Sequence, residues 1–308
     1  MDMNEHSPIK AAGSLIERAG NLYDFSAALK GRAAPALDVS ADLPSPPPVV
    51  PEAVAPVSFA PAAPVAPAWT GPVQMVDRAK LAEAGYILPD GPVTALGEEF
   101  RLLKRELMAR LAEQDRGNRI LVCSAHSGEG KTFCAVNLAL SLAAEKERDV
   151  LLVDADFGKP GIPAAFGLSD GPGLMDALAD PMVAIEDCVI RTDIPSLSVL
   201  PAGQRSNNDT EYLSSARTVA LLDRLTMGRP ERIVIFDSPP LLAASPAAFL
   251  AGHVAIALLV VRADVTGENA LRDAAGMLKG GAQVQLLLNG VQFSSSGRRF
   301  GTYYQKGK

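Results

Sequence analysis

The sequence predicts an α/β fold in which helices cover both faces of a mostly parallel β-sheet. Short apolar runs alternate with stretches of helical character between residues 119 and 290, which is the pattern of repeated βαβ units. A glycine-bearing loop joins the first of these runs to the next helical stretch. Two later runs end in aspartates, at the edge where open parallel sheets bind their ligands.

Six apolar runs are expected to be strands, and their lack of polar alternation is typical of strands buried on both faces. They lie at 120–123, 150–153, 197–200, 233–236, 254–261 and 284–288. Helical stretches separate most of them, at 131–146, 209–227, 243–251 and 266–279. Two further helices are predicted upstream, at 77–85 and from 98 to about 114, the second with an apolar stripe along one face.

Composition divides the chain into three parts. Residues 1–75 contain a short amphipathic stretch at 14–25, expected to be a docking segment, and a Pro/Ala-rich linker expected to be disordered. Ten of the 24 prolines lie between residues 44 and 72, a density that excludes helix and interior strand. Residues 76–290 are predicted to form the domain that carries the loop, and 291–308 a flexible basic tail.

The charge and the cysteines exclude several classes of protein. A net charge of −6 argues against a nucleic-acid binder. Three cysteines without metal-ligand or redox spacing indicate a reducing compartment. No apolar run approaches the roughly 18 residues of a membrane span, and the N-terminus has no secretory signal. We therefore expect a cytoplasmic protein with no membrane span of its own.

The loop Ser124-Ala-His-Ser-Gly-Glu-Gly-Lys-Thr132 has the form of a phosphate-binding P-loop between a strand and a helix. Its glycines allow successive N–H groups to point at phosphate oxygens, and the following helix adds its positive end. Lys131 is expected to reach the β- and γ-phosphates and Thr132 to bind Mg²⁺. Ala125 replaces the usual first glycine. A chance Gly-Lys-Thr in a surface turn is the alternative. The residues expected to contact the nucleotide in this loop are Ser127, Gly128, Glu129, Gly130, Lys131, Thr132 and Phe133.

Three aspartates follow two of the predicted strands. Asp154 and Asp156 come at the end of one apolar run, and Asp237 ends another in the form of a Walker B strand. A carboxylate in such a place is costly to bury unless it has a cation or hydrogen-bond donors. Mg²⁺ held between Asp237 and nucleotide phosphates would meet that requirement. Each acid alone is as readily a loop-start or helix-cap residue, but all three beside a P-loop favour a metal-nucleotide site.

Together the three motifs resemble those of bacterial tyrosine autokinases, P-loop NTPases in which they are called Walker A, A′ and B. The motifs are Ala125-His-Ser-Gly-Glu-Gly-Lys-Thr132, Val150-Leu-Leu-Val-Asp-Ala-Asp156 and Ile233-Val-Ile-Phe-Asp-Ser-Pro-Pro240. Further stretches resemble the branch associated with exopolysaccharide export and exosortase systems. They are Glu98-Glu-Phe-Arg-Leu-Leu-Lys-Arg105, Ala84-Gly-Tyr-Ile-Leu-Pro89, Pro201-Ala-Gly203 with Glu211-Tyr-Leu-Ser-Ser215, and Ser14-Leu-Ile-Glu-Arg18.

The resemblance implies a role for each site residue. Residues 76–290 would be an ATPase or kinase domain binding ATP and Mg²⁺. Thr132, Asp156 and Asp237 would hold the metal, and Asp154 would orient or deprotonate the tyrosine hydroxyl, although the division of roles between Asp154 and Asp156 stays open. Asn289 lies where related ATPases contact adenine, with a plain turn asparagine as the alternative.

The resemblance also implies sites of assembly and of phosphorylation. Glu98, Arg101 and Lys104 match the family's subunit-contact helix, within an oligomerisation segment at 98–105. The alternative for so charged a helix is a solvated face. Tyr303 and Tyr304 would be the phosphoacceptors.

The function implied is an Mg·ATP-dependent protein-tyrosine autokinase that regulates exopolysaccharide polymerisation or export. It would form a ring-like, nucleotide-dependent homo-oligomer held at the inner membrane by a polysaccharide co-polymerase, or chain-length determinant, protein. Gly158, where the family has an arginine, and the short tyrosine cluster leave an ATP-binding scaffold as one alternative. A partition or site-positioning ATPase is the other, but it would carry a second lysine early in the loop, which is absent here.

Overall fold

The structure is a computed structural model, and it describes residues 67–114, 117–206, 208–278 and 280–291. All of them belong to one of the two compact units into which the chain divides, Ala60–Lys308. The other unit, Met1–Phe59, lies outside the described residues. So do the predicted docking segment, most of the predicted linker and nearly all of the predicted tail.

The centre of the described unit is an eight-stranded sheet, whose strands lie in the order β1-β4-β5-β3-β6-β2-β7-β8. Every neighbouring pair is parallel except β4 and β5. The strands are β1 (Val73–Gln74), β2 (Arg119–Ser124), β3 (Asp149–Asp154), β4 (Ile190–Thr192), β5 (Leu197–Leu200), β6 (Arg232–Asp237), β7 (Ile256–Arg262) and β8 (Gln283–Asn289). The predicted parallel sheet and its six strands are confirmed.

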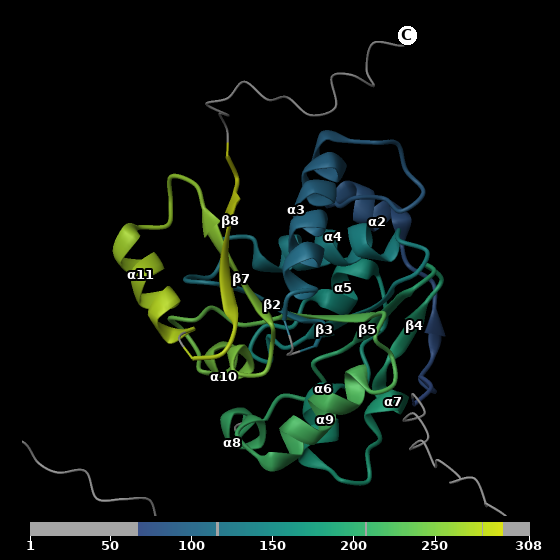
Figure 1. The fold of residues 1–308 in the computed structure, drawn as a ribbon. Helices are drawn as coiled ribbons and strands as arrows, with labels where there is room; N and C mark the ends of the chain where they lie inside the picture. The colour runs from purple at the N-terminus through teal and green to yellow at the C-terminus, as the bar shows by residue number, and fades with distance from the viewer. Residues whose placement is uncertain (1–66, 115–116, 207, 279, 292–308) are drawn as a thin grey trace, which may run out of the picture. The chain divides into compact units, whose positions relative to one another are not determined.

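Helices cover both faces of the sheet, as predicted (Figure 1). One face packs against α2 (Arg78–Glu83), α3 (Ala95–Leu111), α4 (Lys131–Ala143) and α5 (Ile162–Phe166). The other packs against α6 (Leu174–Ala179), α7 (Ile185–Cys188), α8 (Asp209–Leu213), α9 (Ala216–Thr226), α10 (Pro246–Ala251) and α11 (Glu268–Met277). Within the described ranges, no helix is both long and apolar enough to cross a bilayer.

The structure differs from the predicted elements in four places, one of which is β4 (Ile190–Thr192), a strand that was not predicted and that runs antiparallel to β5. The helix predicted at 209–227 is two helices, because Ser214 ends α8 and Ser215 starts α9. Strand β1 lies within the stretch expected to be linker, where Val73 pairs with Arg191 of β4, so the sheet begins before the expected boundary at residue 76. The short helices α5, α6 and α7 were not predicted, since four to six residues are too few for a periodic pattern to be recognised.

Candidate nucleotide-binding site

The three predicted motifs meet at one edge of the sheet, because the strands that carry them are neighbours. β6 pairs with β2 on one side and with β3 on the other. Asp237 lies opposite Val122 of β2 and opposite Asp154 of β3. All three strands are parallel, so their carboxyl ends open onto the same crevice, where α/β sheets bind ligands.

The P-loop needs glycine at two positions and tolerates alanine at a third. Gly128 and Gly130 have φ angles of 82° and 96°, in the left-handed region that side chains disfavour. A Cβ at Gly130 would also lie 2.1 Å from the Asn289 side-chain nitrogen. Ala125 is not among the residues with positive φ, and its methyl group is buried in the core. The missing first glycine therefore does not prevent the loop from forming.

Side chains outside the motif hold the loop in shape. Glu129 is buried and turns back into the loop, where its Oε2 accepts a hydrogen bond from the His126 N–H at 2.9 Å. Its Oε1 accepts from the Thr266 hydroxyl, and the Arg262 guanidinium donates to the Gly128 carbonyl at 3.3 Å. Residues 262 and 266 were not predicted as part of the site. The sequence does place them just after an apolar run. That position would have indicated a contact with the P-loop only if the pairing of β7 with β2 had been known.

Asn289, expected at the adenine, supports the same loop. Its Nδ2 donates to the Glu129 carbonyl at 2.9 Å. One of the two N–H donors of this amide is used in that bond, and Oδ1 remains as a hydrogen-bond acceptor, which matches the exocyclic amine of adenine. Nearby, the ring of Phe133 stacks on Tyr86 with centroids 5.3 Å apart. This contact anchors the start of α4 against the segment before α3.

Lys131 forms an ion pair with Asp156. The ammonium lies 2.8 Å from Oδ2, and the two side chains are only 11% and 7% exposed. Asp156 Oδ1 accepts from the Lys159 N–H at 3.1 Å. The two predicted residues are therefore brought together, and the lysine already has a carboxylate partner that phosphate oxygens would have to replace.

Thr132 and Asp237 form the second pair. The Thr132 hydroxyl donates to Asp237 Oδ2 at 2.7 Å, whereas Oδ1 is buried and accepts no hydrogen bond among the described residues. Burial raises the pKa of the Asp237 carboxyl to about 7, against the opposing effects of the Lys131 ammonium and the Thr132 hydroxyl. A buried carboxylate oxygen without a partner beside a hydroxyl is an arrangement of hard oxygen ligands that fits Mg²⁺. No three His, Cys, Asp or Glu side chains of the described segments group as metal ligands.

Asp154 is fully buried and holds the chain that follows β3. Its Oδ2 accepts from the N–H groups of Gly161 and Ile162, at 2.7 and 2.8 Å, and its Oδ1 from that of Asp156 at 3.2 Å. Burial raises the pKa of Asp154 to about 6, although these three N–H groups favour the ionised form. The carboxylate therefore fixes the position of Asp156, and its predicted contact with a tyrosine stays a prediction.

Comparison with known proteins agrees with this geometry. Residues 116–200 match a family model of the ParA group, described as NUBPL iron-transfer P-loop NTPase. EpsB of Ralstonia solanacearum, named as a tyrosine-protein kinase, is 33% identical over 226 residues, which are 70% of this chain and 28% of EpsB. The tyrosine-protein kinase YwqD of Bacillus subtilis is 32% identical over 180 residues, which are 58% of this chain and 73% of YwqD. The chain belongs to the bacterial tyrosine-protein kinases.

The solved kinase domain of VpsO supports this family assignment. It is 30% identical, has a TM-score of 0.52, and the match covers 63% of this chain and 98% of that domain. The chain thus contains nearly all of a bacterial tyrosine-kinase domain with a P-loop NTPase fold, the fold predicted from its motifs. It spans only 28% of the length of EpsB.

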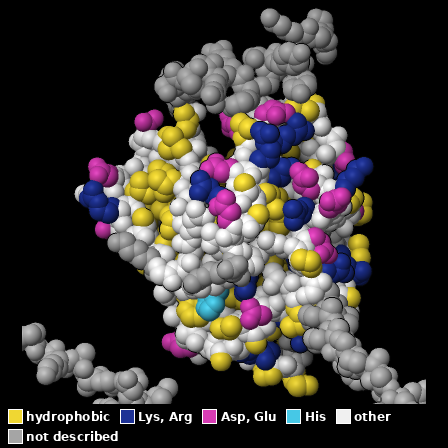
Figure 2. Space-filling model, in the orientation of Figure 1, with side chains coloured by type: hydrophobic (Ala, Val, Ile, Leu, Met, Phe, Trp, Pro, Cys, Tyr) yellow, Lys and Arg dark blue, Asp and Glu magenta, His cyan; other side chains and the backbone are white. Residues whose placement is uncertain are grey.

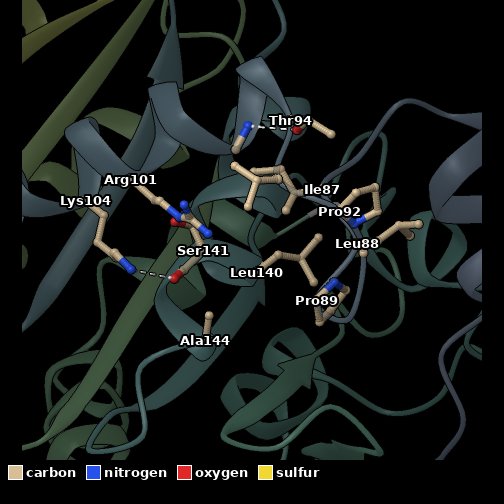
Figure 3. Close-up of a pocket in the computed structure, with 13 residues that line it drawn as sticks. Ile87, Leu88, Pro89, Pro92, Thr94, Arg101, Lys104, Leu140, Ser141 and Ala144 are labelled. Carbon is tan, nitrogen blue, oxygen red and sulfur yellow. Dashed lines mark hydrogen bonds between the residues drawn. The ribbon is translucent and has the colours of Figure 1, made fainter. Parts of the chain in front are cut away.

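The helix predicted to make the subunit contact is α3, and its three predicted residues differ in their surroundings. Arg101 pairs with Glu98 one turn away, and their side chains are 51% and 24% exposed. Lys104 instead lies against α4, where its ammonium donates to the Ser141 carbonyl at 3.1 Å (Figure 3). The same ammonium pairs with Glu145, just after that helix, at 2.6 Å. Lys104 therefore has a role within the subunit that the sequence did not predict.

A pocket of about 90 Å³ opens beside these residues, between α3, the end of α4 and the segment 87–94 (Figure 3). Its α4 residues are Leu140 and Ser141, about two and a half turns from Lys131 at the other end of that helix. It is therefore separate from the nucleotide site.

One residue of the acidic motif that follows β3 departs from the expected pattern. Gly158 has no side chain where an arginine was expected, and the nearest atom to a Cβ built there is Asp156 Oδ1 at 3.8 Å. Lys159, the next residue, is exposed. The predicted acceptors Tyr303 and Tyr304 lie outside the described residues.

Proposed function

We propose that this chain acts as an Mg·ATP-dependent protein-tyrosine autokinase that regulates exopolysaccharide polymerisation or export. The observation that carries the proposal is the buried, unpartnered Oδ1 of Asp237 beside the Thr132 hydroxyl and the Lys131–Asp156 pair. A P-loop, a hard-cation site and a second acidic strand at one crevice are what phosphoryl transfer from a nucleotide requires.

Nucleotide binding would rearrange the Lys131–Asp156 pair. Phosphate oxygens cradled by the loop N–H groups would take the Lys131 ammonium from the carboxylate, which lies 2.8 Å away in the present structure. Asp156 would then be free to face the metal shell. Lys131 would neutralise charge on the β- and γ-phosphates, which is most of the help that phosphoryl transfer needs.

Thr132 and Asp237 would hold Mg²⁺ between them and the phosphates. When bound, the ion neutralises the charge that develops on the phosphate oxygens. Because burial raises the pKa of Asp237 to about 7, this residue would lose a proton as the cation binds near neutral pH.

The acceptor hydroxyl would meet the carboxylates after β3. Asp154 is proposed to orient or deprotonate it, with Asp156 supporting the metal. The contacts of Asp154 give it a positioning role whatever else it does, since its two oxygens accept three backbone N–H groups. Asp154→Asn should therefore disturb the segment 155–162, whereas Asp156→Asn should release only Lys131 and one backbone N–H.

The partners are part of the proposal. We expect a ring-like, nucleotide-dependent homo-oligomer through Glu98 and Arg101 of α3. We also expect attachment at the cytoplasmic face of the inner membrane through a polysaccharide co-polymerase protein. The stretch 14–25 is the proposed docking segment for that protein.

One observation favours a second candidate, a nucleotide-binding scaffold of the export complex. With Gly158 in place of an arginine, the site has one cation fewer beside the phosphates, and only the exposed Lys159 is near in sequence. A partition-type ATPase has less support, because no second lysine precedes Lys131 in the loop.

The test is to incubate purified chain with Mg·ATP, with and without the cytosolic segment of the co-polymerase, and to measure phosphotyrosine and released phosphate together. A kinase gives phosphotyrosine, whereas a partition-type ATPase gives phosphate release without it. Nucleotide binding with neither product would support the scaffold.

A further inference from the structure

The P-loop is held from the side of β7 and β8 by two side chains. Arg262 and Asn289 lie opposite each other at the ends of these strands. The Arg262 guanidinium donates to the Gly128 carbonyl at 3.3 Å, and Asn289 Nδ2 donates to the Glu129 carbonyl at 2.9 Å. Two consecutive peptide groups of the loop therefore each have their carbonyl held by a side chain of the sheet.

These contacts also fix the direction of two N–H groups. In a trans peptide the C=O and N–H bonds point in opposite directions. The peptide of the Gly128 carbonyl carries the Glu129 N–H, and that of the Glu129 carbonyl carries the Gly130 N–H. Because both carbonyls face β7 and β8, both N–H groups face away from these strands. β6 and β3 lie on that side of β2, so the N–H groups are directed toward the crevice at which the three motifs meet.

The Gly130 N–H is available to a ligand in this crevice. It donates no hydrogen bond to any described residue, whereas the Gly130 carbonyl accepts from the Cys134 N–H of α4. By contrast, the His126 N–H at the start of the loop is occupied by Glu129 Oε2. Free N–H groups that point to one side of a glycine-bearing loop are what binds phosphate oxygens.

Arg262 brings a positive charge to this arrangement. Its side chain is exposed and forms no ion pair with any described residue. A charged donor on a carbonyl polarises the whole peptide group and makes its N–H a stronger donor. The charge of Arg262 therefore acts on the crevice through the peptide between Gly128 and Glu129, in a site where Gly158 supplies no cation.

A short turn after β7 keeps Arg262 in place. The Arg262 N–H donates to the Thr266 hydroxyl at 2.9 Å, and the Thr266 N–H donates back to the Arg262 carbonyl at 3.0 Å. The same hydroxyl donates to Oε1 of the buried Glu129. The backbone of Arg262 is thus tied to the loop by contacts within the protein itself, as a preorganised site requires.

We propose that Arg262, together with Asn289, is a positioning residue that aims the N–H groups of Glu129 and Gly130 at the phosphate chain of the nucleotide. Arg262 acts through the peptide group and need not touch the nucleotide. The inference rests on the proposed binding of Mg·ATP, but not on the phosphorylation of tyrosine. Arg262 then serves the recognition of phosphates and not of adenosine, because both N–H groups belong to the phosphate-binding loop.

The experiment is an NMR titration of the full chain with Mg·ATP and, separately, with Mg·tripolyphosphate, which has the phosphate chain without adenosine. Arg262→Met keeps a long side chain but removes its charge and its donors. We expect this variant to bind both ligands about tenfold more weakly than wild type, because one charged hydrogen bond is lost. Arg262→Lys keeps the charge and a donor, and it should bind both ligands more tightly than Arg262→Met.

Two further measurements need no ligand. In the free protein the amide resonance of Glu129 should broaden in Arg262→Met, because its peptide group is no longer held in one orientation. The free energy of unfolding should stay at the wild-type value, because the Arg262 side chain is exposed.

Arg272→Met is the matched control. Arg272 lies on α11, where Figure 2 shows basic and acidic side chains side by side, and it pairs with Glu268 at 2.6 Å. This variant also loses an exposed arginine, but one without contact to the P-loop, so it should bind both ligands as wild type does.

Equal affinities of wild type and Arg262→Met would overturn the proposal. So would a loss confined to Mg·ATP, since Arg262 would then contact adenosine. A lower free energy of unfolding in Arg262→Met, with no recovery of affinity in Arg262→Lys, would show a structural role only and would also overturn it. A wild-type protein that binds neither ligand would refute the proposed nucleotide site, and this inference with it.

Discussion

The strongest single prediction concerns Asp237→Asn, which should make the nucleotide-free protein more stable at pH 8 while abolishing Mg²⁺-dependent ATP binding. Burial raises the pKa of this carboxyl from 3.8 to about 7. A folded-state pKa above the unfolded value means that the folded state binds the proton more tightly. The contribution of Asp237 to wild-type stability therefore falls as the pH rises from about 4 to about 7, and the full penalty is present above that range.

The magnitude follows from the same interval. From 3.8 to about 7, at 1.36 kcal/mol per pH unit, the penalty is about 4 kcal/mol. Asparagine keeps the acceptor for the Thr132 hydroxyl but places an amide at the position of Oδ1, where no partner exists among the described residues. An unpaired buried donor costs about 1–3 kcal/mol. The variant should gain about 1–3 kcal/mol at pH 8, and near pH 4, where wild type is protonated, it should be less stable than wild type.

The assay is urea unfolding of wild type and variant at pH 4.5 and pH 8, without Mg²⁺ or nucleotide. Asp149→Asn is the control, since Asp149 is ion-paired with the buried Arg232 at 2.7 Å and its loss should destabilise the protein at pH 8. If Asp237→Asn were less stable than wild type by the same amount at both pH values, the cost assigned to the buried charge would be wrong.

Three further predictions concern other parts of the molecule. Lys131→Met should abolish phosphorylation and lower the free energy of unfolding by about 3 kcal/mol, because it leaves Asp156 buried without a cation. Adding Asp156→Asn should restore the stability but not the phosphorylation. A Lys131→Met variant as stable as wild type in urea unfolding would contradict this. Asn289→Ala should weaken ATP binding about tenfold in calorimetry by removing one support of the P-loop, and an unchanged affinity would refute that role. The double variant Glu98→Ala with Arg101→Ala should be monomeric in light scattering and should retain its ATP affinity. An unchanged oligomer would mean that this face of α3 is solvated and makes no subunit contact.

The sequence predicted the sheet and the nucleotide motifs because both depend on local patterns. Apolar runs mark strands buried on both faces, and the acids of β3 and β6 are next to them in the chain. The braces of the P-loop could not be predicted, since Arg262 and Thr266 reach it only because β7 lies beside β2. Lys104 gave the same difficulty. The resemblance to a subunit-contact helix predicted that Lys104 lies between subunits, but its side chain packs on α4 and pairs with Glu145.

Intact-mass and peptide mass spectrometry after incubation with Mg·ATP tests the central claim most directly. Wild type should gain phosphate on Tyr303 and Tyr304, and the double variant Tyr303→Phe with Tyr304→Phe should lose nearly all of it. The inactive control is Lys131→Met with Asp156→Asn, in which the buried charge is balanced and the fold retained. A wild-type protein that binds ATP yet gains no phosphotyrosine, even with the cytosolic segment of the proposed membrane partner, would contradict the kinase assignment and support the scaffold.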